Sequence, residues 1–203
     1  MNSLSEEQKQ ALKDKYGLKL HISLIEKYKI KKAILLIMAF ALIGIATYYI
    51  YLAGKFPRGI QLSNDVQIDS IVVYKSKRQM EVYSKGELLK TYKISLGSEP
   101  VGAKEFEGDK KTPEGLYFIS DRNPNSRYHK NLGISYPNDD DIEYAKRFGK
   151  SAGSDIKIHG IGKYIPIIVH LADWTLGCIA VTDEEIDELY NTVKIGAKIN
   201  IKP

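Results

Sequence analysis

Hydrophobic residues follow two different patterns along this chain of 203 residues. Residues 33–54 form an apolar run of 22 residues without a charge, whereas from Val66 onward short runs alternate apolar and polar side chains. A helix of that length spans about 33 Å, enough to cross a hydrocarbon core of ~30 Å. A cleaved signal peptide has a shorter apolar segment and a small-residue cleavage site. The first pattern therefore favours an uncleaved, single transmembrane helix over 33–54.

The second pattern predicts a mainly β domain over residues 66–203. β-branched residues that alternate with polar ones are typical of strands with one buried face. Strands are expected at 66–74, 79–83, 88–96, 115–120, 155–159, 166–170, 178–181 and 198–202. The segments 75–78 and 85–86 are expected to form hairpin turns, because they carry polar and glycine residues between strands. Such connections indicate mainly antiparallel pairing.

One or two short helices complete the predicted domain. Thr182 and Glu185 form a capping-box pattern ahead of the apolar residues Ile186 and Leu189, which indicates the start of a helix. A second helix is expected at 139–148, and the three aspartates that open it lack the spacing of a calcium loop.

Charge is concentrated at one end of the chain. The formal net charge is +5 and the isoelectric point is about 9.0. Residues 1–32 hold eight lysines and four acidic residues, whereas residues 60–203 hold 20 basic and 21 acidic residues. A nucleic-acid-binding domain would carry its positive charge on the folded part. The distribution therefore excludes nucleic acid as a partner of the β domain.

The same charges predict an orientation in the membrane. Lysines beside an apolar helix mark its cytoplasmic side. Residues 1–32 are therefore expected to be a basic cytoplasmic tail, with a short helix that a Ser5–Gln8 capping box begins. Residues 55–65, which contain Pro57 and Gly59, are expected to be a linker. The β domain would then lie outside the cytoplasm, on the periplasmic side of the inner membrane.

Cys178 is the sole cysteine, so the chain forms no internal disulfide. A lone cysteine is commonly a small buried hydrophobe, which is the alternative to a catalytic role. A thiol nucleophile needs a nearby base. His159 ends one predicted strand and Cys178 begins another, so neighbouring strands would bring the two together, with His170 as a rival base. The spacing of histidine and cysteine matches no zinc site, and neither metal nor cofactor is predicted.

Several ordered motifs resemble the L,D-transpeptidase catalytic domain family of the YkuD type. Ile158-His159-Gly160 precedes Thr175-Leu176-Gly177-Cys178-Ile179 by a spacer that this family shares. Further segments that resemble the family, or one subgroup of it, are Gly97, 108–109, 111–115, 122–129, 134–138 and 173–182. The resemblance implies an L,D-transpeptidase-like β-sandwich or barrel. Two positions differ from the common motif, since Leu176 replaces a histidine and Ala180 replaces an arginine or asparagine.

The resemblance also implies roles for individual residues. Cys178 would attack a peptidoglycan stem peptide as nucleophile, and His159 would act as its base. The backbone N–H groups of Gly177 and Cys178 would stabilise the oxyanion, and the Gly160 carbonyl would orient the imidazole. The residues expected to contact substrate are Arg122, Arg127, Tyr128, His129, Tyr136 and Thr175.

Three functions remain open at this point. The first is L,D-transpeptidation, in which an amine resolves the acyl-enzyme formed on the third stem-peptide residue. The second is hydrolysis by a carboxypeptidase or amidase, in which water resolves the same intermediate. The third is a non-catalytic module that binds the cell wall, although such a binder has no need of an oxidisable thiol. The expected partners are the stem peptide and the cytoplasmic membrane, and the sequence predicts no oligomeric state.

Overall fold

The computed structural model describes residues 5–54, 61–162 and 172–203, except for the side chains of 17–26 and 49–54. The chain divides into two compact units, Met1–Arg58 and Gly59–Pro203. The strand expected at 166–170 and the rival base His170 lie outside the described residues.

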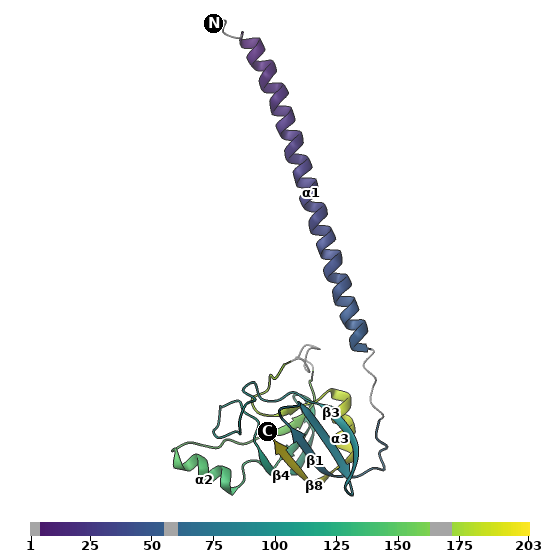
Figure 1. Ribbon diagram of the computed structural model, residues 1–203, viewed down its shortest axis with the longest axis vertical. Helices are drawn as coiled ribbons and strands as arrows, with labels where there is room; N and C mark the ends of the chain where they lie inside the picture. The colour runs from purple at the N-terminus through teal and green to yellow at the C-terminus, as the bar shows by residue number, and fades with distance from the viewer. Residues whose placement is uncertain (1–4, 55–60, 163–171) are drawn as a thin grey trace. The chain divides into compact units, whose positions relative to one another are not determined.

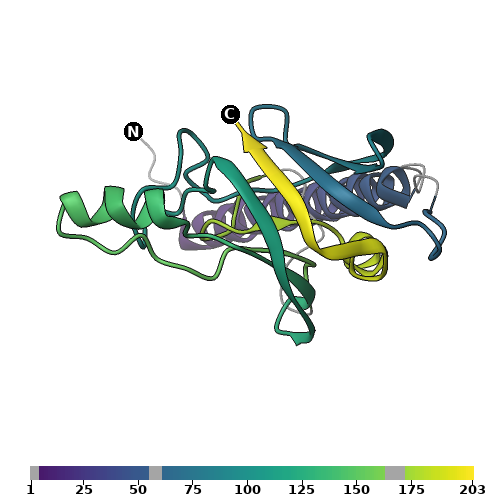
Figure 2. The ribbon, with the colours of Figure 1, turned by 90° about the horizontal axis from the view of Figure 1, so that it is seen from below.

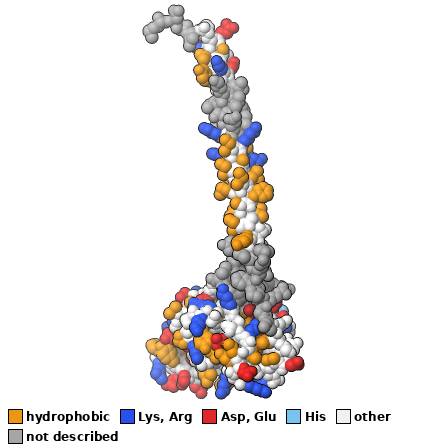
Figure 3. All heavy atoms as spheres, turned by 45° about the vertical axis from the view of Figure 1, so that its right-hand side comes forward, with side chains coloured by type: hydrophobic (Ala, Val, Ile, Leu, Met, Phe, Trp, Pro, Cys, Tyr) orange, Lys and Arg blue, Asp and Glu red, His pale blue; other side chains and the backbone are white. Residues whose placement is uncertain are grey.

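The first unit contains one continuous helix, α1 (Glu6–Gly54). The predicted capping box is confirmed, because the Gln8 backbone N–H donates to Ser5 Oγ and the Ser5 N–H donates to Gln8 Oε1. The expected tail helix and the expected apolar helix are therefore one element without a break. Its segment Lys27–Tyr48 has a mean hydropathy of 2.0 and is long and apolar enough to cross a membrane. Figure 3 shows hydrophobic side chains around this segment, with lysines at one end of it.

The second unit is built on one sheet of eight strands among the described residues. The strands are β1 (Ile68–Tyr74), β2 (Gln79–Ser84), β3 (Glu87–Lys93), β4 (Gly115–Ser126), β5 (His129–Ile134), β6 (Lys157–His159), β7 (Ile179–Ala180) and β8 (Val193–Lys202). Their order is β3-β2-β1-β8-β4-β5-β6-β7. Figure 2 shows β8 between β1 and β4. The pairs β1·β8 and β6·β7 are parallel and the other pairs are antiparallel, as the local hairpins predicted.

Alternation along the strands supplies the hydrophobic core of this unit. In β1, Ile68, Ile71 and Val73 are buried, and in β8 the alternate residues Ile199 and Ile201 are buried. Burial of apolar area of this kind provides most of the free energy that holds a sheet domain together. The mainly β fold class is thereby confirmed.

Two helices accompany the sheet, as Figure 1 shows. Helix α2 (Asp139–Arg147) begins at Asn138, and helix α3 (Asp183–Thr192) begins at Thr182. Both helices start with a capping box. The N-cap side chain accepts a hydrogen bond from the backbone N–H three residues later, and the side chain of that later residue accepts one from the N-cap backbone N–H. The three aspartates 139–141 form the first turn of α2, where negative charge stabilises the helix. Both predicted helices are confirmed.

One strand was not predicted from the sequence, and several strands begin or end at other residues than predicted. Strand β5 (His129–Ile134) was not expected, because its letters HKNLGI lack the alternation that marks a strand. Strand β8 begins five residues before the expected start at Lys198, and β7 covers only Ile179–Ala180. The turns at 75–78 and 85–86 lie where they were predicted.

Candidate active site

His159 and Cys178 lie on neighbouring parallel strands. His159 ends β6, and Cys178 comes directly before β7. The register pairs Ile158 with Ile179 and His159 with Ala180. Because side chains alternate along a strand, Cys178 shares the face of Ala180 and therefore of His159. The expectation that two adjacent strands bring these residues to one edge is met by this pairing.

The His159 imidazole is held in one orientation. Its Nδ1 atom lies 2.6 Å from the Gly160 carbonyl oxygen. A carbonyl oxygen only accepts, so Nδ1 carries the proton and Nε2 is the basic nitrogen of the neutral ring. The ring stacks on Tyr128 at 4.7 Å and contacts Trp174 edge-on at 5.7 Å between centroids. Burial lowers the pKa of His159 below its ordinary value, and the hydrogen bond to Gly160 opposes this.

Gly160 fits a space that admits no side chain. A Cβ atom there would lie 2.4 Å from Asp183 Oδ1. The same oxygen accepts hydrogen bonds from the backbone N–H of Ile161 at 2.7 Å and of Gly162 at 3.1 Å. The first residue of α3 therefore fixes the loop that carries the Gly160 carbonyl, which in turn fixes His159.

The Cys178 thiol is half-buried and uncharged at neutral pH. Sγ lies 3.6 Å from the backbone oxygen of Asp155. Burial raises the pKa of the Cys178 thiol above its ordinary value, and a hydrogen bond from the Lys157 backbone N–H to the sulfur partly offsets this. With the pKa of His159 lowered, the two groups form a neutral thiol and a neutral imidazole rather than an ion pair.

The loop before Cys178 is closed by hydrogen bonds of its own. Thr175 is buried, its Oγ1 donates to the Cys178 carbonyl at 2.7 Å, and it accepts from the Gly177 N–H at 3.1 Å. Thr175 therefore closes the loop, and its expected contact with substrate stays a prediction. The Gly177 N–H is already engaged, so it is not an open donor for an oxyanion. Gly177 has a φ of +132°, and a Cβ there would lie 2.7 Å from the Lys111 carbonyl oxygen.

Arg122 and His129 face α3 and its end rather than Cys178. An Arg122 guanidinium nitrogen donates to the Val193 carbonyl, and the guanidinium lies 5.6 Å from the centre of the Tyr190 ring. His129 Nε2 lies 2.8 Å from Asp187 Oδ1, on the same helix. Their polar groups therefore hold strands β4 and β5 to neighbouring elements, and the expected contact of both residues with substrate stays a prediction.

The remaining residues that were expected to contact substrate are Arg127, Tyr128 and Tyr136. Arg127 is exposed, and its guanidinium lies 6.0 Å from the centre of the Tyr128 ring, which itself stacks on His159. Tyr136 is buried and its hydroxyl donates to the Ala152 carbonyl at 2.8 Å. Because its hydroxyl is already hydrogen-bonded, Tyr136 offers its ring rather than its hydroxyl to a ligand. Leu176, which stands where the common motif has histidine, is 76% exposed.

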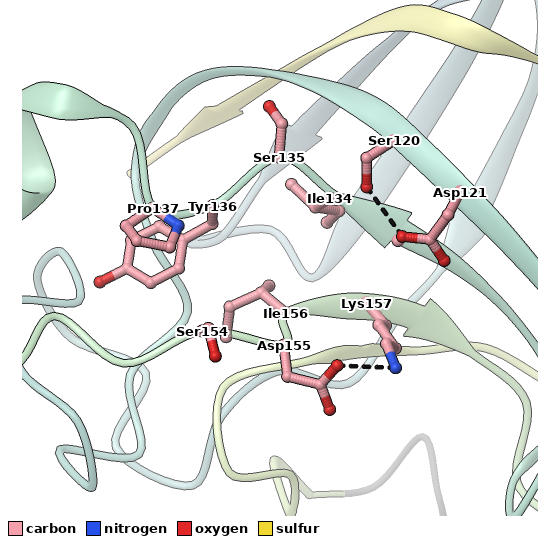
Figure 4. A pocket seen from close by; sticks show the side chains of 11 residues that line it. Ser120, Asp121, Ile134, Ser135, Tyr136, Pro137, Ser154, Asp155, Ile156 and Lys157 are labelled. Atoms are coloured by element: carbon pink, nitrogen blue, oxygen red, sulfur yellow. Dashed lines mark hydrogen bonds and ion pairs between the residues drawn. The ribbon is translucent and has the colours of Figure 1, made fainter.

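A polar groove beside Cys178 was not found from the sequence. It has a volume of about 440 Å³, and Asp121, Gly133, Tyr136, Asp155 and Lys157 are among its lining residues. Figure 4 shows Asp121 and Lys157 at one end of it and the Tyr136 ring at the other. A local pattern does not reveal this groove, because Asp121 lies on β4, whereas Asp155 and Lys157 lie just before and at the start of β6.

Asn131 lies next to the histidine and was not predicted from the sequence. It lies opposite His159 in the register of β5 and β6 and is buried. Its Oδ1 atom has no hydrogen-bond partner in the part of the chain that the structure describes. In the same described part, no cluster of three or more His, Cys, Asp or Glu residues is arranged to hold a metal ion.

The sheet places a histidine and a cysteine on adjacent strands, and a family model assigns the domain that contains them to a known class. The model of the YkuD L,D-transpeptidase catalytic domain matches residues 68–201. The chain belongs to this family, as the sequence motifs predicted.

Individual relatives support the assignment. The Escherichia coli (strain K12) protein YafK, provisionally named an L,D-transpeptidase, is 36% identical over 131 residues, which cover 61% of this chain and 46% of that protein. The structure of the helical cell shape determining protein Pgp2 from Campylobacter jejuni has a TM-score of 0.54 and 26% identity, covering 68% of this chain and 48% of that one. The matched part thus spans about half the length of these relatives.

Proposed function

We propose that this chain is a membrane-anchored cysteine acyltransferase that acts on peptidoglycan stem peptides. The observation that carries the proposal is the parallel pairing of β6 and β7, which puts His159 and Cys178 on one face with the imidazole fixed by Gly160. Membership of the L,D-transpeptidase family supports the reaction class. Pgp2, a cell shape determinant, supports a role in the cell wall.

The first half of the proposed reaction forms an acyl-enzyme. His159 Nε2 takes the Cys178 proton while the sulfur forms a bond to the carbonyl carbon of the third stem-peptide residue. The tetrahedral intermediate then collapses, the C–N bond to the fourth residue breaks, and His159 returns the proton to the departing amine of D-alanine. General-base help of this kind contributes about 10²–10⁴-fold to a rate.

The second half resolves the thioester. An acceptor amine gives its proton to His159 Nε2 and attacks the thioester carbonyl, after which the C–S bond breaks and the sulfur regains the proton. With the Gly177 N–H engaged by Thr175, we assign the oxyanion contact to the Cys178 N–H. One backbone donor at that position is worth on the order of 10²–10³ in rate.

Membrane anchoring is the second part of the proposal. The apolar segment Lys27–Tyr48 supplies a span, and lysines before and at its start favour a cytoplasmic N-terminus. The catalytic unit would then lie on the periplasmic side of the inner membrane, where stem peptides are assembled into the wall.

One reaction tests the chemistry. The full chain is incubated in detergent with a disaccharide tetrapeptide, and the products are followed by mass spectrometry. Cross-linked dimers support transpeptidation, whereas tripeptide without dimers indicates the hydrolytic alternative. Cys178→Ala is the matched control and is expected to give neither. A wild-type chain that gives no product and forms no acyl adduct with a carbapenem would instead be a wall-binding module.

A further inference from the structure

The carboxylate of Glu188, on helix α3, joins three parts of the second unit. Its side chain is 3% exposed. Oε2 accepts from Lys90 Nζ at 2.6 Å and from the Tyr92 hydroxyl at 2.8 Å, and Oε1 accepts from the backbone N–H of Leu62. Figure 1 shows α3 next to β3, the strand that carries Lys90 and Tyr92. A carboxylate that is taken out of water needs such donors, because an unpaired buried charge is costly. The position of Glu188 therefore depends on these donors.

Two of the donors belong to the sheet, whereas Leu62 belongs to the chain that follows helix α1. The Leu62 side chain packs against the core. The next residue, Ser63, begins a turn in which its carbonyl accepts from the Val66 N–H at 3.0 Å. In the chain after α1, as far as the structure describes it, Leu62 is the first residue bonded to the rest of the second unit. Any force that pulls on the chain from the side of α1 therefore reaches this contact before it reaches strand β1.

Helix α3 connects this contact to the loop of the histidine. Asp183, five residues before Glu188, accepts the N–H groups of Ile161 at 2.7 Å and Gly162 at 3.1 Å. Five residues of an α-helix span about 7.5 Å, and a packed helix transmits a displacement as a rigid element. A shift of Glu188 is thus passed to Asp183, and from there to the loop that carries the Gly160 carbonyl.

The other contacts of α3 constrain it less. Ile186 and Leu189 are buried in the core, but apolar packing has no preferred direction. Asp187 pairs with Lys130 Nζ at 2.8 Å, although the Asp187 side chain is 44% exposed, and an exposed ion pair contributes little. The buried and directional bonds of Glu188 therefore determine where the helix sits along its own axis.

We infer that Glu188 is a positioning residue for the proposed reaction, and that the Leu62 N–H couples the chain leaving the membrane helix to it. The inference rests on the proposed function. With Leu62 bound, Glu188 holds α3 where Asp183 fixes the histidine loop. With Leu62 detached, Glu188 Oε1 loses a hydrogen bond that water must replace, so the carboxylate moves toward solvent and Asp183 moves with it. The segment after the membrane helix thereby supports the base of the reaction.

Removing the Leu62 N–H tests the inference in the full chain in detergent. Leu62→Pro has no N–H to donate, whereas Leu62→Ala keeps the N–H and loses most of the side chain. Gln61→Pro places a proline at the exposed neighbouring position as a matched control. Leu62→Pro is expected to lower kcat about 10-fold with KM unchanged, because small displacements of a base are costly. Both other variants are expected to keep the wild-type kcat, and a wild-type kcat in Leu62→Pro would overturn the inference.

A second acceptor-side variant separates positioning from stability. Glu188→Leu removes the acceptor, so Leu62→Pro is expected to have no further effect on kcat in that background, because both changes break the same bond. Losses that multiply would show two independent effects and reject the coupling. Ile201→Ala, at the other end of β8 from α3, opens a cavity in the core and is expected to lower the melting temperature while kcat stays at the wild-type value. An equal loss of kcat in Ile201→Ala and Glu188→Leu would reduce the role of Glu188 to stability.

Hydrogen exchange gives a readout that needs no turnover. The amides of Ile161 and Gly162 donate to Asp183, so their exchange is expected to be about 10-fold faster in Leu62→Pro than in wild type. The amides of β1 and β8 are expected to exchange at the wild-type rate in the same variant. Equal acceleration in all segments would indicate global destabilisation and reject the positioning role.

Failure of the proposed function gives a different result. A wild-type chain without turnover, in which Leu62→Pro still accelerates exchange at residues 161–162, would reject the acyltransferase and retain the contact as the support of the loop. An active wild-type chain whose kcat and local exchange are both unchanged by Leu62→Pro would retain the acyltransferase and reject the positioning role.

Discussion

Burial favours the uncharged form of both His159 and Cys178. The pKa of His159 lies below its ordinary value of 6.5, and the pKa of Cys178 lies above its ordinary value of 9.0. Between these limits the imidazole is neutral and the thiol is protonated. The proposed reaction therefore begins with proton transfer to His159 Nε2, and not from a thiolate that exists before substrate binds.

The pH dependence of alkylation and turnover follows from these directions. Alkylation of Cys178 by iodoacetamide needs the thiolate, so its rate is expected to be low at pH 7 and to rise through a pKa above 9.0. Turnover needs a neutral imidazole, so kcat/KM is expected to fall only when the pH drops below 6.5. Pseudo-first-order alkylation and a pH–rate profile measure the two. A thiolate that titrates below pH 7 would show an ion pair and contradict the neutral state.

Gly177 is predicted to tolerate no side chain. Its φ of +132° belongs to glycine, and a Cβ would meet the Lys111 carbonyl oxygen at 2.7 Å. Gly177→Ala is therefore expected to lose about 1–3 kcal/mol in the free energy of unfolding and to displace Cys178. Urea denaturation measures this, with Gly86→Ala as control, because Gly86 also has a positive φ but open space around it. Equal losses in the two variants would show that the close contact has no effect.

Helix α3 contributes to the site through its first turn. Thr182 caps the helix, while the next residue, Asp183, accepts the two backbone N–H groups of Ile161 and Gly162. The helix start thus connects the core to the loop that orients His159. Thr182 stabilises the helix and Asp183 positions the loop. Substitutions at these two adjacent residues can therefore separate an effect on stability from an effect on positioning.

Asp183→Ala is expected to lower kcat about 10-fold or more, because the loop that holds the Gly160 carbonyl loses its acceptor and small displacements of a base are costly. Asp183→Asn keeps an oxygen acceptor and is expected to restore most of the activity. Thr182→Ala is the control, with a loss of about 1 kcal/mol in stability and little change in kcat. Steady-state kinetics beside thermal unfolding distinguish the two effects. Equal kcat in Asp183→Ala and Thr182→Ala would refute the positioning role.

At the scale of the whole molecule, charge and hydropathy are segregated along the chain. The net charge of +5 arises in the residues before and just after the apolar segment, whereas residues 60–203 are nearly neutral. This distribution is the one that the proposed topology predicts, with the lysine-rich end on the cytoplasmic side.

Reporter fusions after Pro203 test the orientation. Alkaline phosphatase, which folds outside the cytoplasm, is expected to be active there, and a fluorescent protein that matures only in the cytoplasm is expected to be dark. Replacing Lys27, Lys29, Lys31 and Lys32 by glutamine is expected to raise the fraction of inverted chains. A bright cytoplasmic reporter on the unaltered chain would contradict the proposed topology.

Local patterns predicted much of this molecule, and pairing between distant strands accounts for the rest. The capping boxes at Ser5 and Thr182 are signals within four residues, so they could be recognised directly. The groove lined by Asp121, Gly133 and Lys157 depends on the register of three strands, which no single segment encodes. The engagement of the Gly177 N–H depends on the rotamer of Thr175, which the sequence does not specify.

The position of Trp174 makes the site observable without a label. It is the single tryptophan of the chain, and its ring lies 5.7 Å from His159 and 6.0 Å from Tyr128. Indole fluorescence responds to the charge and polarity beside the ring. All intrinsic tryptophan emission therefore comes from a ring that contacts His159. Stopped-flow fluorescence of the unmodified protein can thus measure the rate at which a peptide binds and the rate at which the charge of the imidazole changes.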